Sequence, residues 1–261
     1  NLLFLALLVL VLAMLFGGGK LAPIGERSTL VIAPEGRLVE QYSCDPLSRS
    51  FARATNSQDC REVRLRDLLR ALDSARTDKR IERVALHLYE LEPSGFASLR
   101  DVAAAIAKVK AAKKQVVAFG DNYSQGQYLL AAQANEIYLD PMSQGGVMLE
   151  GLASYRQYFR EALQDKLGVD VHLFKVGEYK SAAEPYILDG ASPESKEADL
   201  FWMNDLWQRM LADAGKARGI APATLALQAD ALAEQVKAVN GDLAQLALNQ
   251  KLVDGLKTRE E

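Results

Sequence analysis

The sequence predicts an α/β domain with a mainly parallel sheet, preceded by an apolar helix. Short runs rich in β-branched residues alternate with segments of helical periodicity, as parallel strands and their crossover helices do. The 261 residues are enough for one large or two small domains, each with its own core. The one compositional outlier is the start of the chain, where apolar residues run without a break from Leu2 to Phe16.

That apolar run predicts a membrane segment. A helix over it reaches roughly 22 Å, short of the roughly 30 Å hydrocarbon core of a bilayer. Because the chain begins inside the run, at Asn1, we expect a truncated transmembrane helix over residues 1–19 and a linker over residues 20–28. A signal peptide without its basic region is one alternative, although no A-x-A site directly follows the run. A buried core helix is the other.

The α/β domain is expected over residues 29–261. Its first strand is predicted at residues 30–32, and the polar stretch 34–61 is predicted to be a long loop. The pattern then predicts helices and strands in turn: a helix at 65–72, a strand at 83–89, a helix around 102–109, a strand at 116–119, a helix from about 124, a strand at 136–139, a helix at 155–167 and a strand at 169–176.

The last third of the chain is predicted to be helical. Ser192 and Pro193 have the residue types of an N-cap and a first helical position, and a long helix with one buried side follows them. The segment after Gly219 is rich in alanine and leucine and is also expected to be mostly helical.

Composition and motifs exclude several classes of function. The formal net charge of −3 gives no reason to expect nucleic acid as a partner. The chain has no C-x-x-C pair and no H-E-x-x-H motif, which disfavours a protein-built zinc site. Its two histidines, His87 and His172, fall inside apolar strand patterns, so a Ser-His-Asp triad is disfavoured. The loop at Gln144-Gly145-Gly146 lacks the glycine spacing of nucleotide-binding motifs.

One lysine lies where α/β folds place working residues. Lys180 belongs to the segment G-E-Y-K-S-A at 177–182, which follows a predicted strand at a strand-to-helix turn. A lysine can act as a general base when burial favours its neutral form. From spacing alone, however, an exposed turn lysine is the simpler interpretation.

Three ordered motifs change that interpretation. They read N-Y-S-Q-G-Q-Y-L at 122–129, V-G-E-Y-K-S-A at 176–182, and E-P-Y at 184–186 followed by Ser192-Pro193. Together they resemble the amino-terminal half of the long-type signal peptide peptidases of peptidase family S49. The resemblance extends, more weakly, from the apolar run to Leu252-Val253-Asp254.

The resemblance implies a layered fold related to the crotonase and Clp-protease fold, with two homologous halves in tandem. In this family the first half supplies a lysine general base and the second a serine nucleophile, and Lys180 stands at the lysine position. The nucleophile motif of the second half resembles A-S-G-G-Y, which places Gln125 where its serine would be. Ser124 is displaced by one residue, or roughly 100° on a helix, and is a poor substitute.

The resemblance therefore assigns the site residues. Lys180 is expected to be catalytic. Contacts with the substrate or the second half are expected from Tyr123, Ser124, Gln125, Gly126 and Ser181. The stretch after the second strand is reduced to Ser94-Gly95, so no oxyanion hole is assigned to this half.

The implied activity is that of a serine-type endopeptidase which degrades signal peptides already released from their proteins. Its expected partners are signal peptides or other short apolar peptides, the membrane and further copies of itself, with no nucleic acid, metal or organic cofactor. The resemblance implies a single-pass protein of the inner membrane with its catalytic body on the periplasmic side. A non-catalytic relative that binds peptides or scaffolds an assembly is the first alternative, and a crotonase-type enzyme acting on acyl-thioesters is the second.

The implied location of the catalytic body outside the cytoplasm also leads to a hypothesis about the two cysteines. Outside the cytoplasm, Cys44 and Cys60 would lie in a compartment that permits a disulfide. We hypothesise that they pair; two unpaired cysteines in a mobile loop are the alternative.

Overall fold

The centre of the structure, a computed structural model that describes residues 2–16 and 23–261, is a five-stranded parallel sheet with the order β1-β4-β6-β8-β10. Its strands are β1 (Ser28–Ile32), β4 (Ile81–His87), β6 (Gln115–Gly120), β8 (Glu136–Leu139) and β10 (Gly255–Leu256). The predicted α/β class with a mainly parallel sheet is confirmed.

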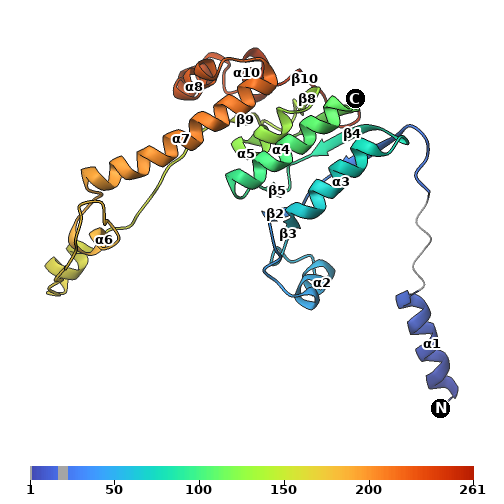
Figure 1. Cartoon of the computed structure of the whole chain (residues 1–261), viewed down its shortest axis with the longest axis horizontal. Coiled ribbons are helices and arrows are strands. Elements are labelled where there is room, and N and C mark those ends of the chain that lie inside the picture. The colour runs from blue at the N-terminus through green and yellow to red at the C-terminus, as the bar shows by residue number, and fades with distance from the viewer. Residues whose placement is uncertain (1, 17–22) are drawn as a thin grey trace.

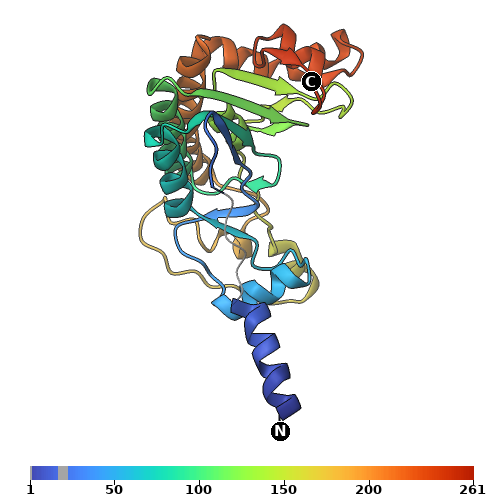
Figure 2. The same ribbon diagram turned by 90° about the vertical axis from the view of Figure 1, so that its right-hand side faces the viewer.

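One face of this sheet is covered by helices. Figure 2 shows α3 (Leu65–Thr77) and α4 (Phe96–Ala111) on the same side of the strands as the long helix α7 (Pro193–Arg218). Alternate strand residues such as Val84 and Val116 are fully buried and share one apolar core with Ile106 of α4. The residues between them, such as His87, are only partly buried. The period of two along each strand thus separates a helix-covered face from an open one.

The stretch 34–61, predicted to be a loop, contains regular structure, so that prediction is wrong. Strand β2 (Gly36–Val39) pairs with β3 (Glu62–Arg64) and β5 (Leu91–Glu92) in a small parallel sheet, and α2 (Pro46–Ala54) lies between β2 and β3. Asp45 caps α2, since its carboxylate accepts hydrogen bonds from the amides of Leu47 and Ser48. An aspartate followed by a proline is a helix-start signal that the sequence does carry.

The hypothesised disulfide is present. Cys44 and Cys60 are bonded to each other, and the crosslink encloses α2 in a closed loop. Both cysteines lie in the segment that connects β2 to β3, so the disulfide restrains that segment.

The carboxyl-terminal part is helical, as predicted. Ser192 caps α7 through a hydrogen bond from the Ser195 amide, and Gly219 ends it in the left-handed conformation at φ 68°. The helices α8 (Pro222–Asp230), α9 (Leu232–Ala238) and α10 (Leu243–Asn249) follow. The chain then returns to the sheet, where Arg218 pairs with Asp254 and the Tyr128 hydroxyl donates to the Leu252 carbonyl.

The segment 149–192, called the arm from here on, differs most from prediction. Residues 155–167 form only a short π-helix, η1 (Glu161–Lys166), and residues 169–176, predicted to be a strand, have no regular structure. Figure 1 shows the arm extending from the body to the amino-terminal end of α7. The apolar side chains that suggested the strand are exposed, with Phe174 95% and Val176 85% accessible. Without a core to pack against, their pattern produces no strand here.

Polar contacts attach the arm to α7. Glu184, at the start of α6 (Glu184–Ile187), is 1% exposed, and its carboxylate accepts bonds from the Ser192 hydroxyl at 2.6 Å and the Ser192 amide at 3.2 Å. Arg156 forms a two-pronged ion pair with Asp199 at 2.9 and 3.0 Å and donates to the Ser195 hydroxyl at 2.9 Å. The arm is therefore held by charged and hydroxyl groups where it has little apolar packing.

The transmembrane helix predicted over residues 1–19 is not found. Helix α1 (Leu2–Phe16) has 15 residues, which span about 22 Å at 1.5 Å per residue. Among the described residues, no helix has both the length and the apolarity needed to cross a membrane. Residues 1 and 17–19 of that prediction, and residues 20–22 of the predicted linker, lie outside the described ranges.

Loss of the disulfide should destabilise the protein. Replacing Cys44 and Cys60 by alanine should lower the free energy of unfolding by about 3 kcal/mol, because the crosslink limits the freedom of the unfolded chain over a separation of 16 residues. Urea unfolding of both proteins, with and without reductant, measures this: reductant should destabilise only the parent. Two free thiols in the denatured, unreduced parent would contradict the crosslink.

The attachment of the arm should weaken in acid. Burial raises the pKa of the Glu184 carboxyl, but the hydrogen bonds from Ser192 and the positive charges of Lys175 and Arg156 together lower it by more, so the folded pKa lies below the ordinary value of 4.5. A lowered folded pKa gives stability that is present above the unfolded pKa and lost as the pH falls through the folded one. The protection of residues 184–192 against hydrogen exchange, measured relative to the intrinsic exchange rate at each pH, should therefore fall below about pH 4.5.

Glu184→Gln should remove most of this pH dependence and loosen the arm already at pH 7. The matched control is Glu178→Gln, since Glu178 is exposed and accepts no hydrogen bond in the described part of the chain. Equal exchange in the two variants at pH 7 would contradict the role given to Glu184.

Candidate active site

Ser124, expected to contact the substrate or the second half, serves a structural role at the start of α5 (Gln125–Ala131). Its hydroxyl accepts a hydrogen bond from the Gln127 amide, and the Gln127 side chain accepts one from the Ser124 amide at 2.9 Å. This capping box satisfies two helix-terminal donors at once. The hydroxyl is thus directed toward its own helix, and no basic side chain among the described residues forms a hydrogen bond with it.

Gln125, which the resemblance predicts to stand at the nucleophile position, forms hydrogen bonds through both the nitrogen and the oxygen of its side-chain amide. Its Nε2 donates to the Gly151 carbonyl at 2.9 Å, and its Oε1 accepts from the amides of Gly151 at 3.1 Å and Glu150 at 3.3 Å. The side-chain amide therefore bonds to backbone groups of Glu150 and Gly151 as the backbone of a paired strand would. These bonds hold the chain in place where the arm leaves the body. A serine is too short to make the same three contacts.

Tyr123 and Gly126, on either side of Ser124 and Gln125, are tightly packed. A Cβ at Gly126 would lie 2.5 Å from the Cβ of Pro93, so only glycine lets α5 approach Pro93 this closely. Tyr123 is completely buried in β7 (Tyr123–Ser124), which pairs with β9 (Val147–Met148). Burial raises the pKa of the Tyr123 phenol, which keeps its proton and donates a hydrogen bond to the Tyr138 carbonyl at 3.2 Å.

Lys180 lies on the arm and is exposed. Its neighbour Tyr179 donates to Glu197 of α7 at 3.0 Å, and the Glu197 carboxylate raises the pKa of the Tyr179 phenol. On the other side, the hydroxyl of Ser181 accepts a long 3.4 Å bond from Arg156. The backbone around Lys180 is therefore tied to α7, while its amine makes no hydrogen bond or ion pair within the described residues.

Lys180 does not follow a strand, and the burial expected for it is not present in this chain alone. Nor does any hydrogen bond in the described ranges join Lys180 to the residues at 123–126. Figure 1 shows α5 within the body, whereas the arm lies at the amino-terminal end of α7, away from the body. Of the predicted site residues, Tyr123, Ser124, Gln125 and Gly126 form one group, and Lys180 with Ser181 forms another.

A hollow of about 470 Å³ lies between the arm and α7. Ser154, Tyr155, Arg156 and Tyr158 line it from the arm, and Lys196, Asp199, Leu200 and Met203 line it from α7. Tyr155 is 94% exposed at its edge. Sequence reasoning missed Arg156 and Glu184, because their partners on α7 and at its N-cap become visible only in three dimensions.

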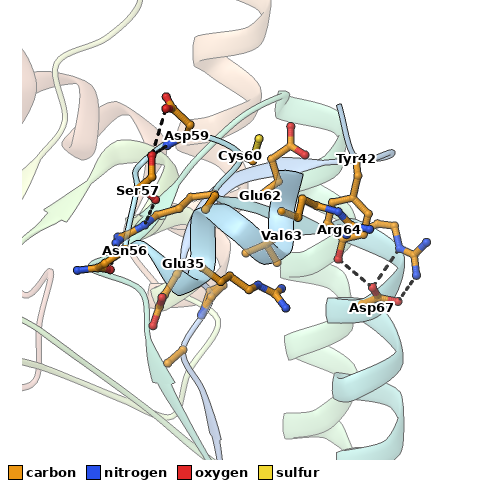
Figure 3. A pocket seen from close by; sticks show the side chains of 16 residues that line it. Glu35, Tyr42, Asn56, Ser57, Asp59, Cys60, Glu62, Val63, Arg64 and Asp67 are labelled. Atoms are coloured by element: carbon orange, nitrogen blue, oxygen red, sulfur yellow. Dashed lines mark hydrogen bonds and ion pairs between the residues drawn. The ribbon is translucent and has the colours of Figure 1, made fainter. Parts of the chain in front are cut away.

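A second hollow, of about 400 Å³, lies beside α2 (Figure 3). In Figure 3, Arg64 points to Asp67 on one side, while Asn56, Ser57 and Asp59 form the other side. The guanidinium of Arg49 lies 3.7 Å from the ring centre of Tyr42. The sequence interpretation as an irregular loop gave no reason to expect these contacts.

No group of three histidine, cysteine, aspartate or glutamate side chains among the described residues could hold a metal ion. His87 ends β4 beside Phe119, and its pKa is lowered by burial and by Arg259. His172 is exposed on the arm, not packed in a strand as predicted.

Comparison with solved structures is weak. Two of the most similar chains are "ThnE from S.clavuligerus" (16% identity, 69% of this chain and 89% of that one, TM-score 0.27) and a probable enoyl-CoA hydratase from Mycobacterium smegmatis (14% identity, 72% and 81%, TM-score 0.26). Scores this low support no argument about the fold, and the crotonase and Clp-protease relation stays a prediction.

Comparison with sequences is decisive. Protease 4 of Salmonella typhi is 37% identical over 256 residues, and Protease 4 of Haemophilus influenzae is 32% identical over 257 residues. The alignments cover 97% and 98% of this chain but only 41% of each relative, so the chain spans about two fifths of their length. The model of peptidase family S49 matches residues 108–261, which include α5 and the arm. The chain therefore belongs to peptidase family S49, a family of proteases.

Proposed function

We propose that this chain is part of a serine–lysine endopeptidase that degrades signal peptides after their release, and that Lys180 is its general base. The proposal depends on the state of Lys180: an exposed amine, without a partner in the described part of the chain, on an arm tied to α7. A family protease needs a group that can accept the nucleophile's proton. The histidines do not suit this role, since His87 ends a sheet strand beside Phe119, and exposed His172 makes no hydrogen bond to a serine among the described residues.

In the proposed reaction, the amine of Lys180 takes the proton of a serine hydroxyl as the serine oxygen attacks the peptide carbonyl. The protonated amine then returns its proton to the leaving peptide nitrogen, and an acyl-enzyme remains. Water, activated by the same amine, releases the acyl group. The lysine must be neutral to start this cycle, and covering the exposed amine with a second protein surface would favour its neutral form.

The serine must come from outside the described residues of this site. Gln125 occupies the nucleophile position, the Ser124 hydroxyl caps α5, and the Ser181 hydroxyl accepts from Arg156. The relatives are more than twice as long as the matched region, which leaves room for a second half. We therefore propose that this chain is the amino-terminal half and that its partner half carries the serine.

The proposed location is the outer side of the inner membrane. The disulfide between Cys44 and Cys60 supports a compartment that permits such bonds. Exposed apolar side chains on the arm and α7, among them Phe174, Val176 and Phe201, support association with the second half or with further copies. Apolar peptides are the substrates that such surfaces could bind.

A non-catalytic role is the second candidate. Gln125 in place of a serine, and the hollow between the arm and α7, would suit a half that only binds peptides. In that case Lys180 would be an ordinary surface lysine and its loss would not affect turnover by the complete protein.

The purified chain of 261 residues should cleave nothing by itself. No described serine has both a free hydroxyl and a neighbouring base, so a fluorogenic peptide library should show no turnover above a buffer blank. Turnover that disappears in Ser124→Ala or Ser181→Ala would mean that the nucleophile lies in this chain.

In the complete protein, Lys180→Ala should reduce kcat by about a hundredfold to ten-thousandfold, the usual contribution of a positioned base. Lys180→Arg should fail as well, because a guanidinium stays protonated at working pH. Peptide turnover, together with circular dichroism and size-exclusion chromatography to check folding and assembly, measures this effect.

The controls are Lys175→Ala and Lys196→Ala, which remove nearby lysines outside the proposed role. Both variants should keep most of the activity. If all three alanine variants were equally active, the non-catalytic candidate would be correct for this half.

A further inference from the structure

The hollow beside α2 contains an arginine whose hydrogen-bond donors are unused. Arg49 lines this space of about 400 Å³, and its guanidinium makes no hydrogen bond or ion pair within the described part of the chain. Its Nε is covered by protein atoms, so this donor is buried and has no partner among the described residues. A buried donor of this kind costs free energy until an acceptor is placed beside it.

Neighbouring side chains hold this guanidinium in place. It stacks on the ring of Tyr42 at 3.7 Å, and the Tyr42 hydroxyl donates to Asp67 at 3.4 Å. Arg64 donates to the same carboxylate at 2.8 and 3.0 Å. Figure 3 shows Tyr42, Arg64 and Asp67 together on one side of the hollow. Because Arg49 is held by stacking, its N–H groups stay available to a ligand.

The helix that carries Arg49 is itself restrained. The carboxylate of Asp45 caps its first turn, and the disulfide between Cys44 and Cys60 closes the loop around it. Ala52, which is buried, and Cys60 both form part of the wall of the hollow. The hollow is therefore shaped by a capped and crosslinked element.

The unused hydrogen-bonding capacity in the hollow belongs mainly to its arginines. Four arginines and four acidic residues line it, so it has no formal net charge. Three of the acids already accept hydrogen bonds from neighbouring groups, and among the described residues only exposed Glu35 accepts none. The side chains of Arg49 and Arg53, by contrast, donate no hydrogen bond within the described ranges. A ligand that complements the hollow must therefore bring acceptors, and directed hydrogen bonds rather than long-range attraction would hold it.

We propose that this hollow binds a carboxylate, and that the ligand is the carboxyl-terminal end of a peptide. A guanidinium can bind a carboxylate through two parallel hydrogen bonds, which adds geometric specificity to the attraction of opposite charges. Hydrolysis of a peptide bond leaves a free carboxylate on one product, whereas an uncut precursor has an amide at the same position. The site would thus hold released peptides in preference to intact precursors. The inference rests on the proposed activity toward released peptides, but not on the role of Lys180.

The test measures peptide binding by the full chain of 261 residues, without any cleavage step. The probe is trifluoroacetyl-alanyl-alanine, and its fluorine NMR signal reports the bound fraction. We expect the free acid to bind, and the corresponding carboxyl-terminal amide to bind at least about tenfold more weakly. The reason is that the amide carries no charge and cannot accept two parallel hydrogen bonds from one guanidinium.

Arg49→Gln should remove the difference between acid and amide. Arg49→Lys should remove most of it as well, because an ammonium keeps the charge but lacks the planar fork. The matched control is Arg66→Gln, since Arg66 is exposed on α3 and does not line the hollow. This control should bind the acid as the parent does, and circular dichroism checks that all variants are folded.

Equal binding of acid and amide by the parent would overturn the proposal without any variant, and so would parent-like binding by Arg49→Gln. Inorganic phosphate serves as a competitor: if it displaced the probe at lower concentration than acetyl-alanine does, the site would be one for anions in general. A trifluoroacetyl-glutamyl-alanine amide tests the source of the carboxylate, and binding equal to that of the free acid would contradict a preference for chain ends. Peptidase assays of the complete protein report on Lys180 separately, so failure of either idea is recognised by itself.

Discussion

The attachment of the arm to the start of α7 is the constraint on which the proposed chemistry depends. Glu184 is buried and bonded to Ser192, and Arg156 holds Asp199 and the Ser195 hydroxyl. An uncompensated buried carboxylate would be costly, so these bonds cannot be lost one at a time without penalty. They position a segment that has almost no apolar core of its own. Lys180 is thereby held on the arm beside α7, although its amine makes no hydrogen bond or ion pair within the described residues.

The second constraint is the amide of Gln125. By bonding to Gly151 and Glu150, it closes the junction between α5 and the arm at the position where we propose that a second half has its serine. Under the proposed division, the same local fold would carry a nucleophile in one half and a structural glutamine in the other. Such a division would account for a lysine amine without a partner in the described residues and for the lack of a suitable hydroxyl among them.

The central sheet could be predicted from the sequence because its side chains bury against one another within this chain. Val84 and Val116 belong to short β-branched runs, and β4 and β6 lie where those runs were found. The arm shows the opposite case. Phe174 and Val176 carry a strand-like pattern but are exposed, so periodicity misleads where the burial partner is absent from the chain. Helix α2 was missed because Ala52 is its single buried residue, which leaves no apolar stripe.

For the candidate site, Ser124 and Lys180 were found through their motifs, whereas the contacts that hold the arm were not. Arg156 and Ser195 are 39 positions apart, and nothing in either local segment indicates that they meet. Local motifs can indicate which residues could take part in chemistry. Which residues meet when they are tens of positions apart in the sequence is decided by the fold.

The most direct test of the proposed role of Lys180 is chemical restoration of its amine in the complete protein. Lys180→Cys should be inactive, and alkylation with 2-bromoethylamine should then restore turnover by rebuilding an amine of nearly the same length. In the described residues both native cysteines are held in the disulfide and are protected, and the same treatment of Lys180→Ala corrects for any other site. The account predicts restoration by bromoethylamine and none by iodoacetamide. Full activity of untreated Lys180→Cys, or no recovery in a folded, fully aminoethylated protein, would contradict it.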